Sequence, residues 1–246
     1  MNVLILKQYS DDIYKIIRDC FPPDWEVSAV SALLPVENTE LMKKLKNADI
    51  LIPEHFEITA DIISQCGKLK IIQTGAGFNN IDLAAAYEKG ITVANASGMN
   101  SSEVAEHVFA LLLAWYKKII YLDREIRSGN WTELSHLKPD GKALDNMTLG
   151  IAGYGNIGRR TAEIAAAFGM KILVYTRKQS EPDKNKHIIQ TDLDTLLRES
   201  DAVTIHLPLT DSTRHFIGKN ELKKMKNNAF LINTSQIGRA SCRERV

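Results

Sequence analysis

The stretch MTLGIAGYGNIGRRTAEIAAAFG, residues 147–169, decides the fold class of this 246-residue chain. It begins as an apolar strand, turns at Gly153, Gly155 and Gly158 in the order G-x-G-x-x-G, and continues as a helix over 156–169. In a dinucleotide-binding unit the first glycine permits a tight turn, the second lets the backbone approach a pyrophosphate, and the third lets the helix pack on the strand. The stretch therefore predicts dinucleotide binding. The alternative is a structural glycine turn in another α/β fold.

Predicted strands and helices alternate on both sides of this stretch. The short apolar runs that predict further strands are 2–6, 48–52, 69–74, 91–96, 171–176, 201–210 and 228–235. The helical patterns between them are 11–20, 38–46, 59–66, 82–88, 192–200 and 220–225. This alternation predicts parallel sheets with helices on both faces, and the near-continuous apolar strands fit burial on both sides. The expected fold class is α/β, with two doubly wound domains that meet near residue 100.

A long helical pattern begins at the predicted domain boundary. It starts with the cap signal SSE at 101–103, keeps apolar residues at three-to-four spacing as far as Ile119, and ends at the stretch SGNW, residues 128–131. Its length fits either a helix that bridges two domains or one long core helix. His107 falls on a face of this helix and is interpreted as a residue that packs at the domain junction.

The end of the strand at 171–176 carries the signal for the type of cofactor. An Asp or Glu at this point would bind the ribose hydroxyls of an adenosine that has no 2′-phosphate. Here Thr176 stands in that position, and Arg177 and Lys178 follow as two cations able to pair with a 2′-phosphate. We therefore expect NADP(H) to be favoured over NAD(H). The alternative is a solvated turn in which both cations only face water.

The composition excludes several other classes of function. A net charge of +1, with 25% charged residues, gives no electrostatic basis for binding nucleic acid or an anionic membrane. The longest nearly apolar run, VFALLLAWY, is too short to span a membrane. The three cysteines, Cys20, Cys66 and Cys242, have no metal-ligand spacing, so we expect reduced thiols in a cytoplasmic protein without a metal site.

Several stretches in the same chain order resemble the D-isomer-specific 2-hydroxyacid dehydrogenases. They are the glycine motif above together with QTGAGFNNIDLAAAYEKGITVANASGMNSSEVAEHVFALLL, DREIRSGNW and DAVTIHLPLTDSTRHFIGKNELKKMKNNAFLINTS, so that the likeness covers residues 45–235. Members of this kind include glyoxylate or hydroxypyruvate reductases and phosphoglycerate dehydrogenases. The resemblance implies reversible reduction of a small 2-keto acid to a D-2-hydroxy acid, with the hydride carried by a nicotinamide cofactor.

The resemblance also implies a domain organisation. Residues 1–99 correspond to the substrate domain, with flavodoxin-like topology, and residues 100–236 correspond to an incomplete Rossmann domain that binds the nucleotide. Members of the family usually form homodimers through the nucleotide domain. The candidate surface in this chain is ALLLAWYKKIIYLDREIRSGNW, residues 110–131.

Site residues follow from the resemblance position by position. The loop Gly75-Ala76-Gly77 resembles the segment whose backbone N–H groups face the carboxylate of the keto acid. The positions that resemble cofactor contacts are Gly153, Gly155, Asn156, Ile157, Gly158, Thr176, Arg177, Lys178, His206, Leu207, Pro208 and Thr234. The side chain of His206 is interpreted as the end of a strand, without a chemical role.

One departure from the family pattern bears on the substrate. Relatives that act on phosphoglycerate carry an Arg-Ser-x-Thr stretch where this chain has Pro53-Glu54-His55-Phe56. The cation for the phosphate is therefore missing, except for a protonated His55. We expect a small acid such as glyoxylate or hydroxypyruvate rather than 3-phosphoglycerate.

The last residues depart from the pattern more strongly. In the family, INTS is followed by the catalytic arginine and later by a catalytic histidine and glutamate, but here Gln236 follows, and 237–246 has no family likeness. The tail resembles a translated sequencing adapter, and the alternatives are a real basic tail or a frameshift. We therefore expect a C-terminally truncated chain that has no catalytic residues and is inactive by itself. The alternative function is that of a non-catalytic, nucleotide-binding protein like the corepressors that share this fold.

Overall fold

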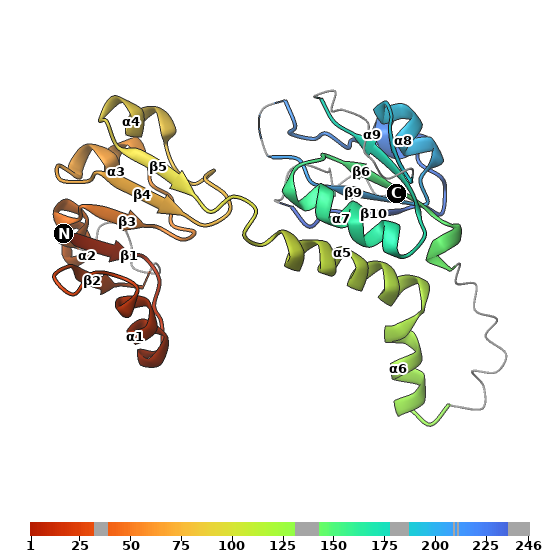
Figure 1. Ribbon diagram of the computed structural model, residues 1–246, viewed down its shortest axis with the longest axis horizontal. Helices are drawn as coiled ribbons and strands as arrows, with labels where there is room; N and C mark the ends of the chain where they lie inside the picture. Colours follow the sequence, from red (N-terminus) through yellow and green to blue (C-terminus); the bar gives the residue numbers. More distant parts are fainter. Residues whose placement is uncertain (32–38, 131–142, 178–186, 209, 211, 236–246) are drawn as a thin grey trace. The chain divides into compact units, whose positions relative to one another are not determined.

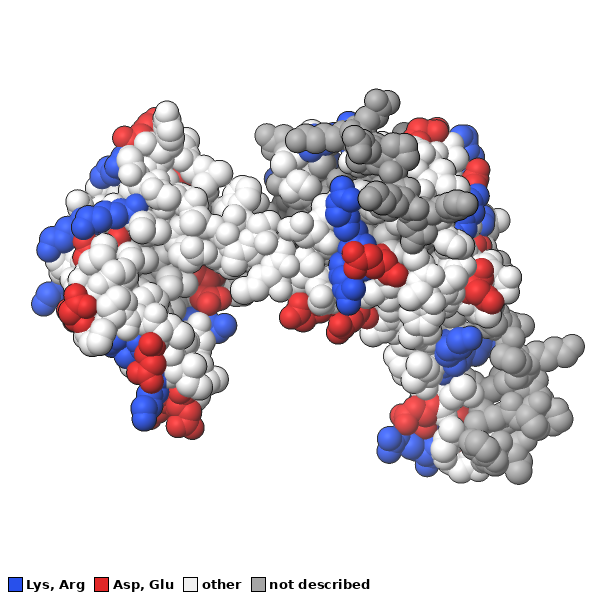
Figure 2. Space-filling view, viewed as in Figure 1, with Lys and Arg blue, Asp and Glu red and all other residues white. Residues whose placement is uncertain are grey.

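A computed structural model describes residues 1–31, 39–130, 143–177, 187–208, 210 and 212–235 of the chain. The chain divides into two compact units, Met1–Met99 and Asn100–Val246, and each is built on its own sheet (Figure 1). Charged side chains of both signs lie interspersed on the surface of each unit in the view of Figure 2. No helix within the described ranges has the length and apolar character needed to cross a membrane.

The first unit is a parallel five-stranded sheet with helices between its strands. Its strands are β1 (Asn2–Ile5), β2 (Glu26–Ala29), β3 (Ile50–Ile52), β4 (Ile71–Thr74) and β5 (Thr92–Asn95). Its helices are α1 (Asp11–Asp19), α2 (Thr39–Asn47), α3 (Ala60–Gln65) and α4 (Leu83–Glu88). All neighbouring strands are parallel, in the order β2-β1-β3-β4-β5. This is the flavodoxin-like order that the resemblance implies.

Both faces of this sheet are buried. In β1 and the residue after it, the side chains of Val3 and Ile5 join one hydrophobic cluster, whereas those of Leu4 and Leu6 belong to another. Each of the four is at most 2% exposed. Successive side chains of a strand point to opposite faces, so a strand covered on both sides has no polar positions. This is why the run at 2–6 is continuously apolar rather than alternating.

The second unit contains the other parallel sheet. Its strands are β6 (Thr148–Ala152), β7 (Lys171–Tyr175), β8 (Ile188–Gln190), β9 (Ala202–Ile205) and β10 (Phe230–Ile232). Its helices are α5 (Ser101–Tyr116), α6 (Ile119–Arg127), the 3-10 helix η2 (Leu144–Asn146), α7 (Asn156–Ala167), α8 (Leu193–Glu199) and α9 (Lys219–Lys224). From β6 the chain adds β7 and β8 on one side and then β9 and β10 on the other, which is the Rossmann order. The expected α/β architecture with two parallel sheets is therefore confirmed.

Two strands have no recognisable pattern in the sequence, and both lie at sheet edges. β2 pairs with β1 alone, and β8 pairs with β7 alone. In β2 only Val27 is buried, and no residue of β8 is buried. Short edge strands with exposed side chains are common in sheets, and they lack the apolar run that marks a central strand. Their sequences therefore carry too weak a pattern to be recognised.

The predicted long helix is in fact two helices. α5 ends at Tyr116 and α6 begins at Ile119, because Lys118 between them has φ 51° and ψ 32°. This left-handed conformation cannot be part of a right-handed helix. The expected SSE cap is also wrong, since the N-cap residue is Asn100 and its side chain makes no cap hydrogen bond. A single continuous helix over this stretch is therefore excluded.

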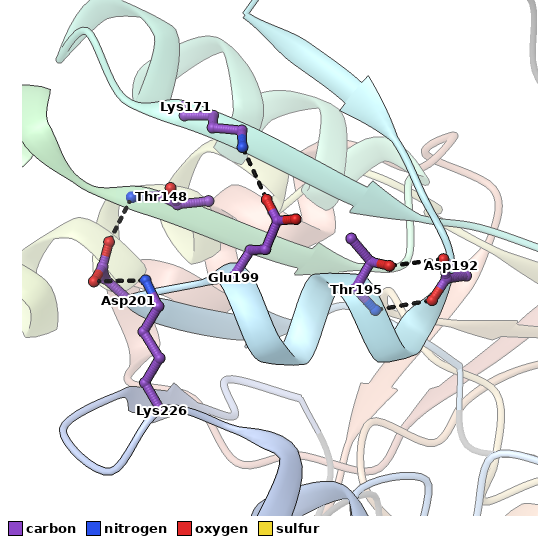
Figure 3. A network of polar contacts seen from close by, with 7 residues as sticks. All are labelled: Thr148, Lys171, Asp192, Thr195, Glu199, Asp201 and Lys226. Carbon is purple, nitrogen blue, oxygen red and sulfur yellow. Dashed lines mark hydrogen bonds and ion pairs between the residues drawn. The ribbon is translucent and has the colours of Figure 1, made fainter.

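Polar contacts join the amino ends of the strands in the second unit (Figure 3). The carboxylate of Asp201, just before β9, accepts a hydrogen bond from the N–H of Thr148 at 2.9 Å and pairs with Lys226 at 3.1 Å. Nearby, Lys171 at the start of β7 pairs with Glu199 at the end of α8, at 2.9 Å. These contacts fix strands at the edge of the sheet that lies opposite their carboxyl ends, so they support the fold rather than a ligand site.

Candidate functional site

The glycine turn after β6 closes only because two of its positions have no side chain. Gly153 has φ +103°, and a Cβ there would lie 2.5 Å from the carbonyl oxygen of His206. A Cβ on Gly158 would collide with the carbonyl oxygen of Gly153. At Gly155, by contrast, a Cβ would meet nothing within 4 Å. Packing therefore requires the first and third glycines, while the second faces open space.

The amino end of α7 opens onto this space. The helix begins at Asn156, directly after Gly155, which caps it without a side-chain hydrogen bond. Both residues are exposed. The first N–H groups of a helix have no partner within the helix, and they carry the positive end of its dipole. An open glycine in front of these groups lets an anion approach them, so the turn fits the pyrophosphate of a dinucleotide.

The turn lies at the carboxyl edge of the sheet, where three strand ends are tied together. The N–H of Gly153 donates to the carbonyl of Tyr175 at the end of β7, at 2.9 Å. The N–H of His206, after β9, donates to the carbonyl of Ala152 at 2.8 Å. The order in which strands are added reverses between β6 and β9. In open α/β sheets, ligands bind outside the carboxyl ends of the strands at such a switch point.

The segment after β9 contributes His206, Leu207 and Pro208 to this edge. The Nε2 atom of His206 lies 3.1 Å from the hydroxyl of Thr204 and 3.4 Å from that of Thr161 in α7. Leu207 is buried and Pro208 is exposed. The half-buried imidazole thus joins β9 to α7, which supports the interpretation of its side chain as structural.

The end of β7 places two of the three predicted cofactor-selecting residues. Thr176 is half-buried, and Arg177 is exposed. The Nη1 group of Arg177 donates a hydrogen bond to the hydroxyl of Ser212 at 3.2 Å. Ser212 belongs to the segment after β9, and the sequence analysis does not single it out, because nothing local links it to Arg177. Lys178 lies outside the described residues.

Arg159 is a second residue that the sequence analysis misses. It lies in the first turn of α7, and its guanidinium is 4.5 Å from the ring centroid of Tyr154, which stands between the first two glycines. The neighbouring Arg160 is instead paired with Glu163 at 2.9 Å. A cation at the amino end of a helix is repelled by the positive end of the helix dipole. A pyrophosphate bound at this end would attract the Arg159 guanidinium and outweigh that repulsion. The position of an arginine directly after the third glycine is the feature of the sequence that indicates contact with a pyrophosphate.

A cavity of about 460 Å³ lies beside the end of β10. It is lined from α5 and from the segment after β10 by Asn100, Glu103, Val104, His107, Leu111, Asn233, Thr234 and Ser235. The hydroxyl of Thr234 is buried and has no hydrogen-bond partner within the described part of the chain. His107 is exposed to this cavity within its unit rather than packed in a core. The feature of the sequence that could have indicated this cavity is the pair Glu103 and His107, a carboxylate and an imidazole four residues apart on one helix face.

In the first unit, the loop Gly75-Ala76-Gly77 follows β4 and is exposed. The carbonyl of Gly75 accepts a hydrogen bond from the N–H of Ala96 at 2.9 Å. The carbonyl of Ala76 accepts one from the side chain of Asn95 at 3.1 Å. These bonds anchor the loop to the end of β5 through its oxygen atoms. The loop therefore lies at the carboxyl edge of a flavodoxin-like sheet, where such folds bind ligands.

The segment Pro53-Glu54-His55-Phe56, after β3, contains a residue in the left-handed region. Glu54 has φ 51° and accepts a hydrogen bond from the hydroxyl of Tyr9 at 3.1 Å. Burial, together with the negative charge of Glu54, raises the pKa of Tyr9. The Nζ atom of Lys7 lies 3.8 Å from the Glu54 carboxylate. The fold thus brings a lysine that follows β1 close to the segment after β3, a contact that the sequence alone does not indicate.

The predictions for the C-terminal end of the chain have no structural counterpart in the described residues. Gln236 and the tail 237–246 lie outside the described residues. In the part of the chain that the structure describes, no three His, Cys, Asp or Glu residues gather into a group able to hold a metal ion.

The profile of a known protein family matches more than half of the chain. The family is described as D-isomer specific 2-hydroxyacid dehydrogenase, NAD binding domain, and the match covers residues 109–240, including the glycine turn. The chain belongs to this dehydrogenase family. The identification agrees with the two parallel sheets and with the position of the glycine turn at the switch point of the second one.

Relatives in this dehydrogenase family act on different acids. Hydroxypyruvate reductase of Thermotoga maritima is 42% identical over 205 residues, which are 82% of this chain and 65% of that protein. Glyoxylate reductase of Aeropyrum pernix is 39% identical over 235 residues, 90% of this chain and 70% of that protein. D-3-phosphoglycerate dehydrogenase of Methanocaldococcus jannaschii is 33% identical over 243 residues, 97% of this chain and 44% of that protein. The chain thus spans less than two thirds of the first and third relatives.

Solved structures share the fold over nearly the whole chain. D-lactate dehydrogenase from Aquifex aeolicus, complexed with NAD and lactic acid, has a TM-score of 0.84 and 28% identity, covering 98% of this chain and 71% of that one. An acyclic imino acid reductase in complex with NADPH and D-Arg has a TM-score of 0.82 and 30% identity, covering 98% and 76%. Structures with this fold therefore hold either form of the nicotinamide cofactor.

Proposed function

We propose that the protein interconverts a small 2-keto acid and a D-2-hydroxy acid with a nicotinamide dinucleotide. The observation that carries the proposal is the glycine turn in front of α7, where packed Gly158 and open Gly155 fit a pyrophosphate in a chain of this dehydrogenase family. The names of the reductases among its relatives supply the substrate class. The cofactor supplies the hydride chemistry, and the residues of the chain bind and orient both molecules.

The two units divide this work. We assign the keto acid to residues 1–99 and the nucleotide to residues 100–236. The backbone N–H groups of Gly75-Ala76-Gly77 hold the substrate carboxylate. The cofactor contacts are Gly153, Gly155, Asn156, Ile157, Gly158, Thr176, Arg177, Lys178, His206, Leu207, Pro208 and Thr234.

A pair of glycine variants tests the nucleotide site. Gly155→Asp places a carboxylate where the pyrophosphate approaches, so binding of both NADH and NADPH is lost while the fold is kept. Gly67→Asp is the matched control, since a Cβ at Gly67 in the first unit also meets nothing within 4 Å. Binding is measured by calorimetry, and circular dichroism checks the fold. Equal binding by the Gly155→Asp variant and the control would refute the proposal.

The preferred cofactor is NADP(H). Thr176 leaves the end of β7 without a carboxylate to repel a 2′-phosphate, and exposed Arg177 provides a cation beside it. Because related structures hold either NAD or NADPH, the preference rests on these side chains alone. The ratio of dissociation constants for NADPH and NADH measures it directly.

The substrate is a small acid such as glyoxylate or hydroxypyruvate. The Nζ atom of Lys7 lies 3.8 Å from the Glu54 carboxylate, which compensates its charge, so this pair offers no net positive charge to a phosphate. Turnover of glyoxylate, hydroxypyruvate and 3-phosphohydroxypyruvate should be compared in a preparation with the native C-terminal sequence. A comparable or higher kcat/KM for the phosphorylated acid would show that this assignment is wrong.

We further propose a homodimer that forms through α5 and α6. A groove of about 880 Å³ there is lined by apolar side chains, among them Trp115, which is 63% exposed, and Ile120, which is 76% exposed. Trp115 stacks on Phe230 at 5.4 Å, so the groove has a rigid floor. An apolar patch of this kind marks a protein interface. Light scattering should give twice the monomer mass for the protein and the monomer mass for Ile120→Asp, with Ile16→Asp in α1 as the control.

Activity of the whole protein depends on position 236. The resemblance places the arginine that holds the substrate carboxylate at Gln236, so residues 1–246 should oxidise no NADPH with any keto acid. Sequencing the gene across codon 236 decides the point. An arginine codon would support the dehydrogenase, whereas a confirmed glutamine without turnover would support a non-catalytic nucleotide-binding protein. Free thiols at Cys20 and Cys66 fit our expectation of a cytoplasmic location.

A further inference from the structure

The hydrogen bond between Arg177 and Ser212 joins two segments that are far apart in the sequence. Arg177 follows β7, and Ser212 lies in the segment after β9, and these two strands flank β6 on opposite sides in the sheet. From this contact we propose that Ser212 and Arg177 together form the binding site for the 2′-phosphate of NADP(H). Ser212 is then a residue that determines cofactor specificity. The inference rests on the proposed nucleotide-binding function and deepens it.

The segment that carries Ser212 is held in place by a buried threonine. Thr213 is 3% exposed, and its hydroxyl accepts a hydrogen bond from the N–H of Thr210 at 2.8 Å and donates one to the carbonyl of Pro208. The hydroxyl of Ser212 in turn lies 3.0 Å from that of Thr210. Through Thr210, the hydroxyl of Ser212 is therefore connected to the buried side chain of Thr213.

A second contact joins the same two segments. The ring of Tyr175, the last residue of β7, packs against the ring of Phe216 at 5.6 Å. The carbonyl of Tyr175 also accepts the hydrogen bond from the N–H of Gly153. The end of β7, the glycine turn and the segment after β9 are thus connected directly. Arg177 and Ser212 therefore belong to the same edge of the candidate nucleotide site as the glycine turn, and this is the edge at which we place the adenosine ribose.

The chemistry of the pair suits a phosphate better than a ribose diol. A guanidinium has five N–H donors, and among the described residues that of Arg177 uses one, on Ser212, and meets no carboxylate. The remaining donors can take a phosphate in the two-pronged geometry that arginine favours. The Ser212 hydroxyl accepts from Arg177 and also contacts the hydroxyl of Thr210 at 3.0 Å, so it donates to a phosphate oxygen only if that oxygen replaces Thr210 as its acceptor. A diol would need a carboxylate acceptor, and Thr176 has replaced it.

The charge and the hydrogen-bond donors at Arg177 and Ser212 suit a dianion. The 2′-phosphate brings close to two negative charges, and the guanidinium of Arg177 lies beside the hydroxyl of Ser212, which is 3.0 Å from that of Thr210. Charge-assisted hydrogen bonds of this kind are about twice as strong as neutral ones. The hydroxyl of Ser212 also fixes the plane of the guanidinium, which reduces the side-chain entropy lost when the phosphate binds.

Two fragments of the cofactor isolate this contribution. 2′,5′-ADP and 5′-AMP differ only by the 2′-phosphate, so the ratio of their dissociation constants, measured by calorimetry on the 246-residue chain, reports on this subsite. We expect 2′,5′-ADP to bind at least about tenfold more tightly than 5′-AMP, as one additional charge-assisted contact would give. Arg177→Ala should abolish the difference. Ser212→Ala should reduce it about threefold to tenfold while 5′-AMP binding changes less than about twofold.

Two more variants make the test specific. Arg177→Lys keeps the charge but loses the planar fork, so the preference for 2′,5′-ADP should fall to an intermediate value. Arg198→Ala removes another exposed arginine of the same unit and should leave both constants unchanged. Thermal unfolding checks that each variant is folded.

The outcomes separate this inference from the function on which it rests. If the folded chain binds neither 2′,5′-ADP nor 5′-AMP, the proposed nucleotide-binding function fails. If both bind equally well and Arg177→Ala changes neither constant, the function stands and the 2′-phosphate site is wrong. An effect of Arg177→Ala without any effect of Ser212→Ala would remove Ser212 from the site.

Discussion

At the scale of single residues, the glycine turn separates two kinds of requirement. A Cβ on Gly158 would meet the backbone of Gly153, whereas a Cβ on Gly155 would meet only open space. Gly158 is therefore constrained by folding, and Gly155 by the ligand that the turn binds. The same three-glycine pattern thus encodes a structural and a functional demand at neighbouring positions, and substitution can tell them apart.

Alanine at the two positions should have different consequences. Gly158→Ala pushes the helix from the turn, so we expect a loss of about 1–3 kcal/mol in unfolding free energy, typical of overpacking, together with weaker dinucleotide binding. Gly155→Ala should keep the stability within about 0.5 kcal/mol and weaken only the binding. Urea unfolding and calorimetric titration with NADPH measure the two effects. Equal destabilisation by both variants would contradict this separation.

Asp49 repeats in the first unit the arrangement of Asp201 in the second. Its carboxylate accepts a hydrogen bond from the N–H of Asn2 at 2.9 Å and pairs with Lys70 at 2.9 Å, and its own N–H donates to the carbonyl of Asn2. Both aspartates directly precede the strand beside the first strand of their sheet. Two different doubly wound sheets thus use the same device to fix the register of neighbouring strands at their amino ends.

This arrangement makes stability depend on pH. The hydrogen bond from Asn2, and then the one from Lys70, hold the pKa of Asp49 below its usual value of about 3.9. A lowered pKa in the folded state contributes stability above the unfolded pKa, and this stability is lost as pH falls through the folded pKa. Asp49→Asn should therefore cost about 1 kcal/mol at neutral pH and progressively less below about pH 4. Urea unfolding between pH 7 and pH 3 measures the difference, with exposed Asp24→Asn as the control. A deficit that stays constant to pH 3 would exclude this role.

At the scale of elements, the sequence predicts what depends on local pattern. The central strands are continuously apolar and the glycine turn has a fixed spacing, so both are recognised. The edge strands β2 and β8, the break at Lys118 and the bond from Arg177 to Ser212 are not. Edge strands bury few of their side chains, so their sequences do not need a continuous run of apolar residues. The break and the bond depend on packing between segments that the sequence does not place side by side, so no local pattern reports them.

The break between α5 and α6 offers a direct test of strain. Lys118 adopts a left-handed conformation, which costs a residue with a Cβ roughly 1–2 kcal/mol and costs glycine almost nothing. Lys118→Gly should therefore raise the unfolding free energy by up to about 1 kcal/mol, after the added flexibility of the unfolded chain is subtracted. Lys117→Gly is the matched control, because Lys117 has φ −91° and should lose stability instead. Chemical unfolding distinguishes them, and destabilisation by both variants would indicate that Lys118 is not strained.

At the scale of the whole molecule, each unit has its own core. The hydrophobic clusters of the first unit include Leu51, and those of the second include Leu149, and both side chains are fully buried. A ligand stabilises the part of a protein that binds it, by about 2.7 kcal/mol at a hundred times its dissociation constant. If the second unit alone holds the adenosine and pyrophosphate, a dinucleotide should protect that unit selectively. Substitutions in each core, and binding of the ligand, can then change the stability of one unit without changing that of the other.

Calorimetry of the whole chain should therefore resolve two unfolding transitions. Leu51→Ala should lower one of them and Leu149→Ala the other, each by about 2–5 kcal/mol, because each opens a cavity in a different core. Saturating NADPH should raise the transition that Leu149→Ala lowers and leave the other within experimental error. The Gly155→Asp variant, which blocks the pyrophosphate, should remove this shift. One transition that both alanine variants lower equally, and that NADPH raises as a whole, would mean that the two units unfold as a single cooperative body.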